Sequence, residues 1–330
     1  MQRIRVLIFG IAMLAPIAMA GDEGVTLGAK SRKFEFTYTA TVKDVPADAK
    51  TVDVWIPVPQ TDVYQEIGKV SFSGNEQPEV AAEAVQNNKM AHWKLPADKA
   101  KGFTVTMTVE CTRHEIVTSN LSKARELTEE ERTTFAPYLK ANKLVLVGGD
   151  FVTIADNATK GARTPVEIAK AAYDYAVTTM KYDKPKDKPG WGQGSTKWAC
   201  DSHFGNCTDF HALVMSIGRT KGVPVKFEIG FPIPEDSKAG AVGGYHCWAK
   251  SYLGGVGWMP VDASEAQKRP EKKDYFCGSL CPNRIHFSNG RDVDLVPRQA
   301  GDALNFFVYP YAEADGKSIA VDKAFAFKDL

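Results

Sequence analysis

Apolar residues alternate with polar ones over much of the first third of the chain. Three such runs occur, at 34–42, 52–58 and 103–111, and Asp, Pro, Asn and Gly residues lie between them. A period of two places the apolar side chains on one face of a β-strand. Several such strands joined by turn residues favour an antiparallel β-sandwich of roughly a hundred residues. We expect this sandwich at 21–118.

The first twenty residues have the pattern of a secretion signal. Arg3 and Arg5 precede an apolar run that ends in Ala-Met-Ala, the small-x-small sequence that a signal peptidase accepts. The run is interrupted by a glycine and a proline, and it is shorter than the roughly 20 apolar residues that a membrane-spanning helix needs. We predict a signal peptide at 1–20, cleavage near Ala20, no membrane span, and a secreted or periplasmic location.

Length and charge limit the remaining possibilities. The chain has 330 residues, so 310 remain after cleavage, which is more than one hydrophobic core usually organises. The formal charge falls from +1 to about −1 when Arg3 and Arg5 are removed, and no basic run occurs. This near-neutral net charge therefore predicts neither a nucleic acid nor an anionic membrane as a partner.

The chain changes character after the sandwich. Residues 119–160 are charged and helix-prone, and we assign them to a helical linker that precedes a second domain at 161–330. That domain opens with a helix whose cap is Thr164, with Pro165 at the first position and Glu167 at the third. We expect its buried face to comprise Ile168, Ala171, Ala172, Tyr175 and Ala176.

Cys207 lies at the start of a predicted buried helix. After Asn206 the apolar residues recur at i, i+3, i+4 and i+7, and the pattern ends at Gly222. Unpaired backbone N–H groups at a helix start carry partial positive charge, which favours a thiolate over a thiol. Position alone fits a small apolar residue equally well, so Cys207 is a candidate nucleophile at this point.

A predicted hairpin supplies two further candidates. Two strands flank a glycine-rich loop, and a hairpin centred near Gly254 pairs residues whose numbers sum to about 508. His246 and Asp262 then oppose each other on one face of the sheet. A slip of one residue would separate them. Taken singly, the histidine fits a structural role and the aspartate a turn.

Together these residues have the chemistry of a thiol enzyme. A thiolate at Cys207 needs a proton carrier, for which His246 is suited, and the imidazole needs an orienting group such as Asp262. The backbone N–H of Cys207 would stabilise an oxyanion. The loop before the helix offers three candidates for a second donor, namely Trp191, Gln193 and Trp198.

Four ordered blocks carry a family resemblance. Residues 205–210 (Gly-Asn-Cys-Thr-Asp-Phe) resemble the nucleophile block of the transglutaminase-like superfamily. Residues 219–226 resemble the stretch that ends its nucleophile helix, 246–248 (His-Cys-Trp) its histidine block, and 258–262 (Trp-Met-Pro-Val-Asp) its aspartate block. The resemblance covers roughly residues 160 to 290.

The resemblance implies a papain-like α+β core, in which the nucleophile helix packs on an antiparallel sheet. It assigns the catalytic roles to Cys207, His246 and Asp262, and the predicted sandwich is similar to β-domains often placed before this core. His211 stands where many members have a small residue. Nothing in the sequence resembles the acidic calcium sites of animal transglutaminases, so we expect no cofactor.

The cysteine and histidine spacing also allows a metal site. Cys200, His203, Cys207 and His211 are spaced as C-x2-H-x3-C-x3-H, and zinc favours such ligands. A zinc site at these residues would not explain why His246 and Asp262 oppose each other in the predicted hairpin.

The remaining cysteines have different surroundings. Cys277 and Cys281 lie close enough in sequence for a local disulfide bridge, whereas Cys111 lies on the apolar side of a strand and fits a core position.

The leading functional hypothesis is an exported acyl-transfer enzyme. It would form a Cys207 acyl-enzyme from a peptide or glutamine amide of a protein or peptide substrate, and water or an amine would then release the acyl group. The alternative is a non-catalytic binding or scaffold protein that uses the same fold.

Overall fold

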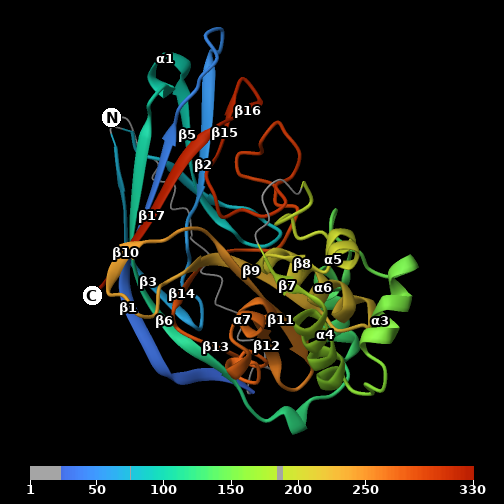
Figure 1. Cartoon of the computed structure of the whole chain (residues 1–330). Coiled ribbons are helices and arrows are strands. Elements are labelled where there is room, and N and C mark those ends of the chain that lie inside the picture. Colours follow the sequence, from blue (N-terminus) through green and yellow to red (C-terminus); the bar gives the residue numbers. More distant parts are fainter. Residues whose placement is uncertain (1–23, 75, 184–188) are drawn as a thin grey trace, which may run out of the picture.

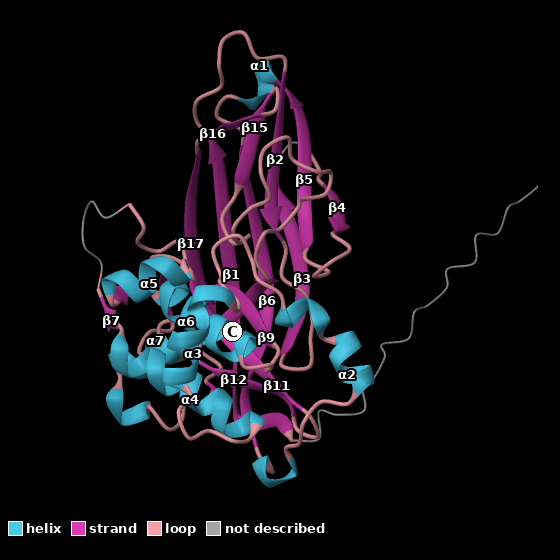
Figure 2. Cartoon of the chain, turned by 90° about the vertical axis from the view of Figure 1, so that its right-hand side faces the viewer, coloured by secondary structure: helices cyan, strands magenta, loops and turns pink. Residues whose placement is uncertain are grey.

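The computed structural model of the chain describes residues 24–74, 76–183 and 189–330. The predicted signal peptide at 1–20 lies outside these residues. Figure 1 shows a tall stack of β-strands with a layer of helices at its lower end. Figure 2, turned by a quarter, shows the helices gathered beside the lower end of the strands.

The tall part of the molecule is made of two sheets. One has the strand order β10-β17-β1-β6-β13, with β3 also paired to β6. The other has the order β16-β15-β2-β5-β4. The strands of the first sheet are β1 (Val25–Val42), β3 (Gln65–Ser73), β6 (Thr104–Thr118), β10 (Ala239–Ala241), β13 (Ser279–Leu280) and β17 (Val321–Asp329). Those of the second are β2 (Thr51–Pro57), β4 (Glu79–Ala82), β5 (Lys89–Pro96), β15 (Tyr311–Ala314) and β16 (Lys317–Ile319), and the short helix α1 (Ala97–Ala100) follows β5.

The alternating apolar residues are buried on one face of each strand, as expected. The apolar residues predicted to share a face of β1 are all buried, whereas the residues between them are half-buried. β2 and β6 coincide with the second and third runs, and Cys111 is buried in β6 as expected. Burial raises the pKa of this thiol to about 12, so it is an unreactive core residue.

The end of the chain belongs to the sandwich as well. β17 pairs with β1 along nine residues, from Phe34 opposite Asp329 to Val42 opposite Val321, and β15 pairs with β2. The predicted division placed residues 311–329 in the second domain. Their pattern does not show that they return to the first sheets, because strand pairing between distant segments leaves no local signal.

A third sheet forms the core of the second domain. Its order is β12-β11-β9-β14, and all of its pairs are antiparallel. The strands are β9 (Val225–Pro232), β11 (His246–Leu253), β12 (Gly257–Val261) and β14 (Arg284–Asn289). The helices are α4 (Pro165–Thr179), α5 (Thr196–Ser202), α6 (Cys207–Thr220) and α7 (Ala263–Lys268), and a small parallel pair consists of β7 (Lys181–Tyr182) and β8 (Phe204–Gly205). The helix α6 packs on β11, which gives the expected α+β core.

The helix α4 begins as predicted but is rotated. Its capping box is present, with Thr164 accepting from the backbone N–H of Glu167. The buried residues are Ala169, Ala172, Tyr173 and Ala176, so three of the five expected positions are only half-buried. The hydroxyl of Tyr173 donates to the carbonyl of Lys273 (2.6 Å). This hydrogen bond satisfies a polar group that is buried with the ring.

Short elements occupy the predicted linker. They include α2 (Glu129–Thr134), whose capping box at Thr128 is present, and α3 (Val152–Ala158). In the described ranges, every helix is too short or too polar to cross a lipid bilayer.

Candidate active site

The thiol of Cys207 lies at the N-terminus of α6. Asn206 caps this helix, and its side-chain oxygen accepts from the N–H of Thr208 (2.9 Å). The helix is buried along almost its whole length, and Cys207 itself is 2% exposed. No described residue accepts a hydrogen bond from the N–H of Cys207, so this donor is available at the helix start.

Asp209 ties the preceding loop to the nucleophile helix. Its carboxylate accepts from the N–H groups of Asn206 (3.0 Å), Gly192 (2.8 Å) and Gly194 (2.9 Å). Burial raises the pKa of this carboxyl to about 6, although the three donors oppose the shift. The sequence analysis assigned Asp209 no role beyond its place in the family block. Its position as third residue after the cap fits the capping box that it forms.

The hairpin brings His246 and Asp262 together in a register that differs from the predicted one. Ala249 pairs with Val261 and Leu253 with Gly257, so the paired numbers sum to 510 rather than 508. A shift of two residues keeps the same face of the sheet. The imidazole Nε2 is therefore still 2.7 Å from Asp262 Oδ2, across a diagonal position.

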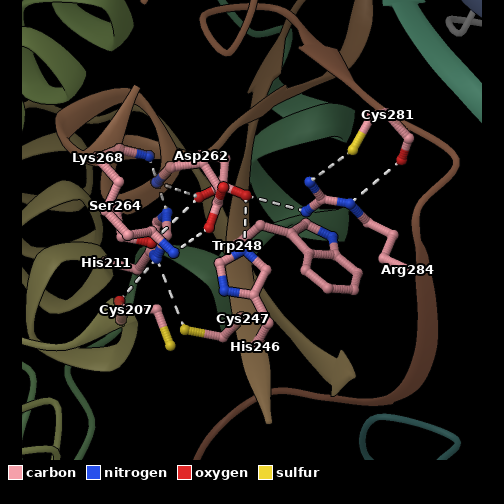
Figure 3. A network of polar contacts seen from close by, with 12 residues as sticks. Cys207, His211, His246, Cys247, Trp248, Asp262, Ser264, Lys268, Cys281 and Arg284 are labelled. Atoms are coloured by element: carbon pink, nitrogen blue, oxygen red, sulfur yellow. Dashed lines mark hydrogen bonds and ion pairs between the residues drawn. The ribbon is translucent and has the colours of Figure 1, made fainter. Parts of the chain in front are cut away.

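The carboxylate of Asp262 is fully hydrogen-bonded. Its Oδ2 also accepts from Arg284 Nη1 (3.0 Å), and its Oδ1 accepts from Ser264 Oγ (3.2 Å) and the N–H of Glu265 (3.1 Å). Asp262 thus caps α7 while it orients the imidazole. Four donors fix its position, and Figure 3 shows it between His246 and Arg284.

Arg284 is a site residue that the sequence analysis missed. It is 2% exposed, and its guanidinium lies 4.8 Å from the ring centre of Trp248. The sequence placed it in no family block, and its approach to Asp262 depends on the pairing of β14 with β9. Together with the three predicted residues it forms the triad cluster, which comprises Cys207, His246, Asp262 and Arg284.

The electrostatics favour a charged pair. Burial opposes the imidazolium, but the charge and hydrogen bond of Asp262 and the contact with Cys207 raise the pKa of His246 to about 9. Burial also opposes the thiolate, yet hydrogen bonds from Cys247 and His246 hold the pKa of Cys207 well below its ordinary value. Both shifts favour the thiolate–imidazolium form of this pair.

The second imidazole nitrogen is the one available to the thiolate. Nε2 is bonded to Asp262, which leaves Nδ1 of His246 for the sulfur. Figure 3 shows the sulfurs of Cys207 and Cys247 side by side near this ring. The arrangement matches the requirement that the orienting group and the nucleophile use opposite nitrogens.

His211 has a structural place beside the site. Its Nδ1 donates to the carbonyl of Cys207 (2.8 Å), and its Nε2 accepts from the N–H of Ala263 (3.2 Å). Burial lowers the pKa of this imidazole, so it is neutral. Both nitrogens are occupied, which leaves none for the zinc site considered above. Among the described residues, no group of three His, Cys, Asp or Glu side chains is arranged around a metal position.

The three candidates for a second oxyanion donor point elsewhere. Trp191 Nε1 donates to the carbonyl of Asp183 (2.6 Å), Gln193 Nε2 to that of Pro189 (2.8 Å), and Trp198 Nε1 to that of Phe204 (3.2 Å). Each group is engaged with a backbone oxygen. The loop instead binds Asp209 through the N–H groups of Gly192 and Gly194, and it supplies no second oxyanion donor from the three predicted side chains.

All six cysteines are free thiols. The bridge considered between Cys277 and Cys281 is not formed. Cys281 Sγ accepts from Arg284 Nη2 (3.5 Å), and burial raises the pKa of Cys277 to about 11.

A cavity of about 420 Å³ reaches the imidazole of His246. Charged side chains of both signs line it, including Glu265, Arg269 and Arg284.

Comparisons with known proteins agree with this geometry. Residues 152–263 match the model of the transglutaminase-like superfamily. The chain is 26% identical over 325 residues to an uncharacterized protein of Haemophilus influenzae, and the match covers 86% of each. Its fold is similar to that of a Cytophaga hutchinsonii protein described as a "putative cysteine protease", with a TM-score of 0.62, 14% identity and 93% of each chain covered. Residues 152–263 thus form a domain of transglutaminase-like type, as the sequence blocks predicted.

Proposed function

We propose that this chain is an exported thiol acyl-transfer enzyme that acts on peptide or glutamine amides, with water as the favoured acceptor. The observation that carries the proposal is the position of Cys207 at the start of α6 beside His246, whose Nε2 lies 2.7 Å from Asp262 Oδ2. The pKa shifts of Cys207 and His246, which favour a thiolate–imidazolium pair, support it. A buried charge pair of this kind costs desolvation energy. It is a typical arrangement for an activated nucleophile. Export rests on the signal-peptide pattern of residues 1–20.

In the first half of the reaction the thiolate sulfur of Cys207 attacks the amide carbonyl carbon. A C–S bond forms, and the negative charge moves to the carbonyl oxygen, which the backbone N–H of Cys207 stabilises. His246 then gives its Nδ1 proton to the amide nitrogen as the C–N bond breaks. An amine or ammonia leaves, and a thioester and a neutral imidazole remain.

In the second half His246 acts as a base. It takes a proton from water as the water oxygen attacks the thioester carbonyl, the C–S bond breaks, and the carboxylic acid leaves. The thiolate of Cys207 and the imidazolium are thereby restored. A primary amine in place of water would give a new amide, which is the transglutaminase outcome. Asp262 keeps the same ring nitrogen bonded throughout.

The experiment uses a library of peptide amides that includes glutamine side chains. We expect a mass-spectrometric acyl adduct on Cys207 and release of amine or ammonia from the wild type. Cys207→Ala should lose both while keeping its fold by circular dichroism. Cys200→Ala is the matched control, because Cys200 is a half-buried thiol on the neighbouring helix α5, and it should behave as the wild type.

An electrophilic probe separates the enzyme from the scaffold alternative. The thiolate predicts that iodoacetamide labels Cys207 before the other five cysteines at pH 6.5. Reaction no faster than that of free cysteine, together with no acyl adduct from any amide, would contradict the enzyme and favour a binding role.

A further inference from the structure

A second polar cavity, of about 260 Å³, lies between the sandwich and the core sheet. Its lining comes from the loops at 60–64 and 86–87 of the sandwich and from β9, β11, β12 and β14. Cys247 contacts His211 of α6, and successive side chains of a strand point to opposite faces. Lys250, which lines the cavity, therefore faces away from α6.

Two lysines face each other in this cavity. Lys226 of β9 and Lys250 of β11 are a directly opposed pair. Like charges in such positions repel. A single carboxylate serves both, since Glu228 Oε1 lies 3.0 Å from the Lys226 ammonium and 2.9 Å from that of Lys250. The other oxygen of Glu228 accepts from Trp248 Nε1 (2.6 Å).

Arg113 is a third cation near the two lysines. Arg113 is fully buried, and none of its three guanidinium nitrogens has a hydrogen-bond partner among the described residues. Its charge acts on Asp62 and Lys250, and its guanidinium lies 5.9 Å from the ring centre of Trp248. The cavity also contains Asp62, whose Oδ2 is 3.4 Å from His286 Nδ1.

The cluster therefore has a surplus of positive charge. We name it the lysine cluster, and it comprises Lys226, Lys250, Arg113, Glu228 and Asp62. Burial would raise the pKa of Glu228 and of Asp62. Lys250 and Lys226 hold the pKa of Glu228 below its ordinary value, and the hydrogen bond with His286 and the charge of Arg113 do so for Asp62, so the ionised form is favoured in both. Three cations thus face two carboxylates. Burial lowers the pKa of Lys250 despite Glu228, whereas Glu228 outweighs burial at Lys226 and raises its pKa.

The cavity walls restrict the ligand that would supply the missing charge. The Lys226 ammonium lies 5.1 Å from the ring centre of Trp258, and that of Lys250 lies 4.8 Å from the ring centre of Tyr64. Phe287 adds a further aromatic wall. The volume is below the range typical of drug-sized ligands. A short molecule with one anionic end and an apolar body fits both the charge and the rings.

We propose that this cavity binds a small organic carboxylate, with its head group against the ammonium groups of Lys226 and Lys250 beside Glu228, and its apolar part against Trp258. Glu228 already shows that the two ammonium groups accept a carboxylate. A second carboxylate would make three anions for three cations. Trp248 lies between this site and Arg284 of the triad cluster, and binding does not depend on catalysis.

The test is a titration of the protein with sodium propionate at constant ionic strength, with chloride and sulfate as comparison anions. We expect a saturable change in tryptophan emission and a rise in melting temperature, both equal in the wild type and in Cys207→Ala. Lys226→Met should weaken binding at least about tenfold, because a charge-assisted contact is lost. Lys69→Met, which removes an exposed lysine of β3, should bind as the wild type. In Trp258→Phe the emission change should disappear while the thermal shift persists.

Three results would overturn the inference. One is the absence of a saturable propionate effect, another is full binding by Lys226→Met, and the third is sulfate binding as tightly as propionate. If Lys226→Met does not fold, a crystal structure of the wild type with propionate decides. The carboxylate should then contact the two ammonium groups beside Glu228, and an empty cavity would refute the proposal.

Discussion

Two largely buried ionic clusters lie along the strand β11, one at His246 and one at Lys250, with Trp248 between them in the strand. They differ in how their charges are balanced. In the triad cluster, the thiolate of Cys207 and the carboxylate of Asp262 face the imidazolium of His246 and the guanidinium of Arg284. Cations and anions are equal in number there. The lysine cluster has three cations and two anions.

The two clusters differ in whether each buried charge has a partner. Buried ions are tolerated when each has a partner and its remaining hydrogen bonds are satisfied. Asp262 meets this condition with four donors, so the geometry at His246 is fixed. Arg113 does not meet it, since its nitrogens have no partner among the residues described. A preorganised site and an incomplete one thus share a single strand.

Removal of the imidazole breaks the balance of the triad cluster and has the largest expected effect. In His246→Ala the pKa of buried Cys207 should return to its ordinary value of 9.0 or above. Each unit lowers the thiolate fraction tenfold, so alkylation by iodoacetamide at pH 6.5 should slow at least about 100-fold. The rate is measured by mass spectrometry of Cys207. Glu228→Gln changes the other cluster and should leave the rate unaltered, and a similar fall in that variant would contradict the separation.

The lysine cluster should respond in opposite ways to the loss of an anion and of a cation. Glu228→Gln leaves the two ammonium groups without their shared partner, and we expect the free energy of unfolding to fall by about 3–5 kcal/mol. Lys226→Met removes the surplus charge and keeps the apolar stem against Trp258, so its effect should stay within about 1 kcal/mol. Urea unfolding measures both. Equal losses would mean that the cluster is balanced after all.

The two clusters should also differ in their response to pH. The folded pKa of His246 is raised to about 9 from 6.5, so its contribution to stability is complete below pH 6.5 and is lost as the pH rises through 9. The loss amounts to about 3 kcal/mol. The carboxylates of the lysine cluster have lowered pKa values and contribute a constant amount in this range. The lowered pKa of Cys207 acts in the opposite direction, because its contribution to stability grows as the pH rises toward 9. Unfolding free energies at pH 6, 7.5 and 9 should therefore change little in the wild type and in Glu228→Gln, and they should decline in Cys207→Ala, where no thiolate offsets the loss at His246.

The smallest expected effect is a shift in the pKa of Cys207 when its neighbour Cys247 is replaced. The thiol of Cys247 donates to the Cys207 thiolate, so Cys247→Ala should raise the pKa of Cys207 by about one unit. The ultraviolet absorbance of the thiolate, followed against pH, measures the shift. Cys111→Ala is the matched control, because it removes a buried thiol that is distant from the site and should leave the titration unchanged.

The sequence predicted those features that have a local or periodic signal. The strands β1, β2 and β6, the capping boxes at Thr128 and Thr164, and the position of Cys207 at a helix start all agree with the structure. The pairing of His246 with Asp262 was also expected, although the hairpin centre lies one residue later than predicted. The error did not separate the two residues, because a change of two in the sum of the paired residue numbers leaves both side chains on the same face of the sheet.

Features that depend on contacts between distant segments could not be predicted. Arg284 reaches Asp262 through the pairing of β14 with β9, and Arg113 reaches the lysine cluster through the packing of the sandwich on the core sheet. No periodicity marks either residue. The buried face of α4 was misplaced because several small and aromatic residues allow more than one apolar stripe, and packing against α6 and α7 decides among them.

The position of β17 has a consequence for how the protein is made. This strand fills the place between β10 and β1, yet it is translated after the other strands described here. Until then one edge of β1 has no partner, and its row of free peptide groups offers a template for pairing with another chain. A chain truncated before Val321 therefore exposes this edge of the sheet, and it should form inclusion bodies.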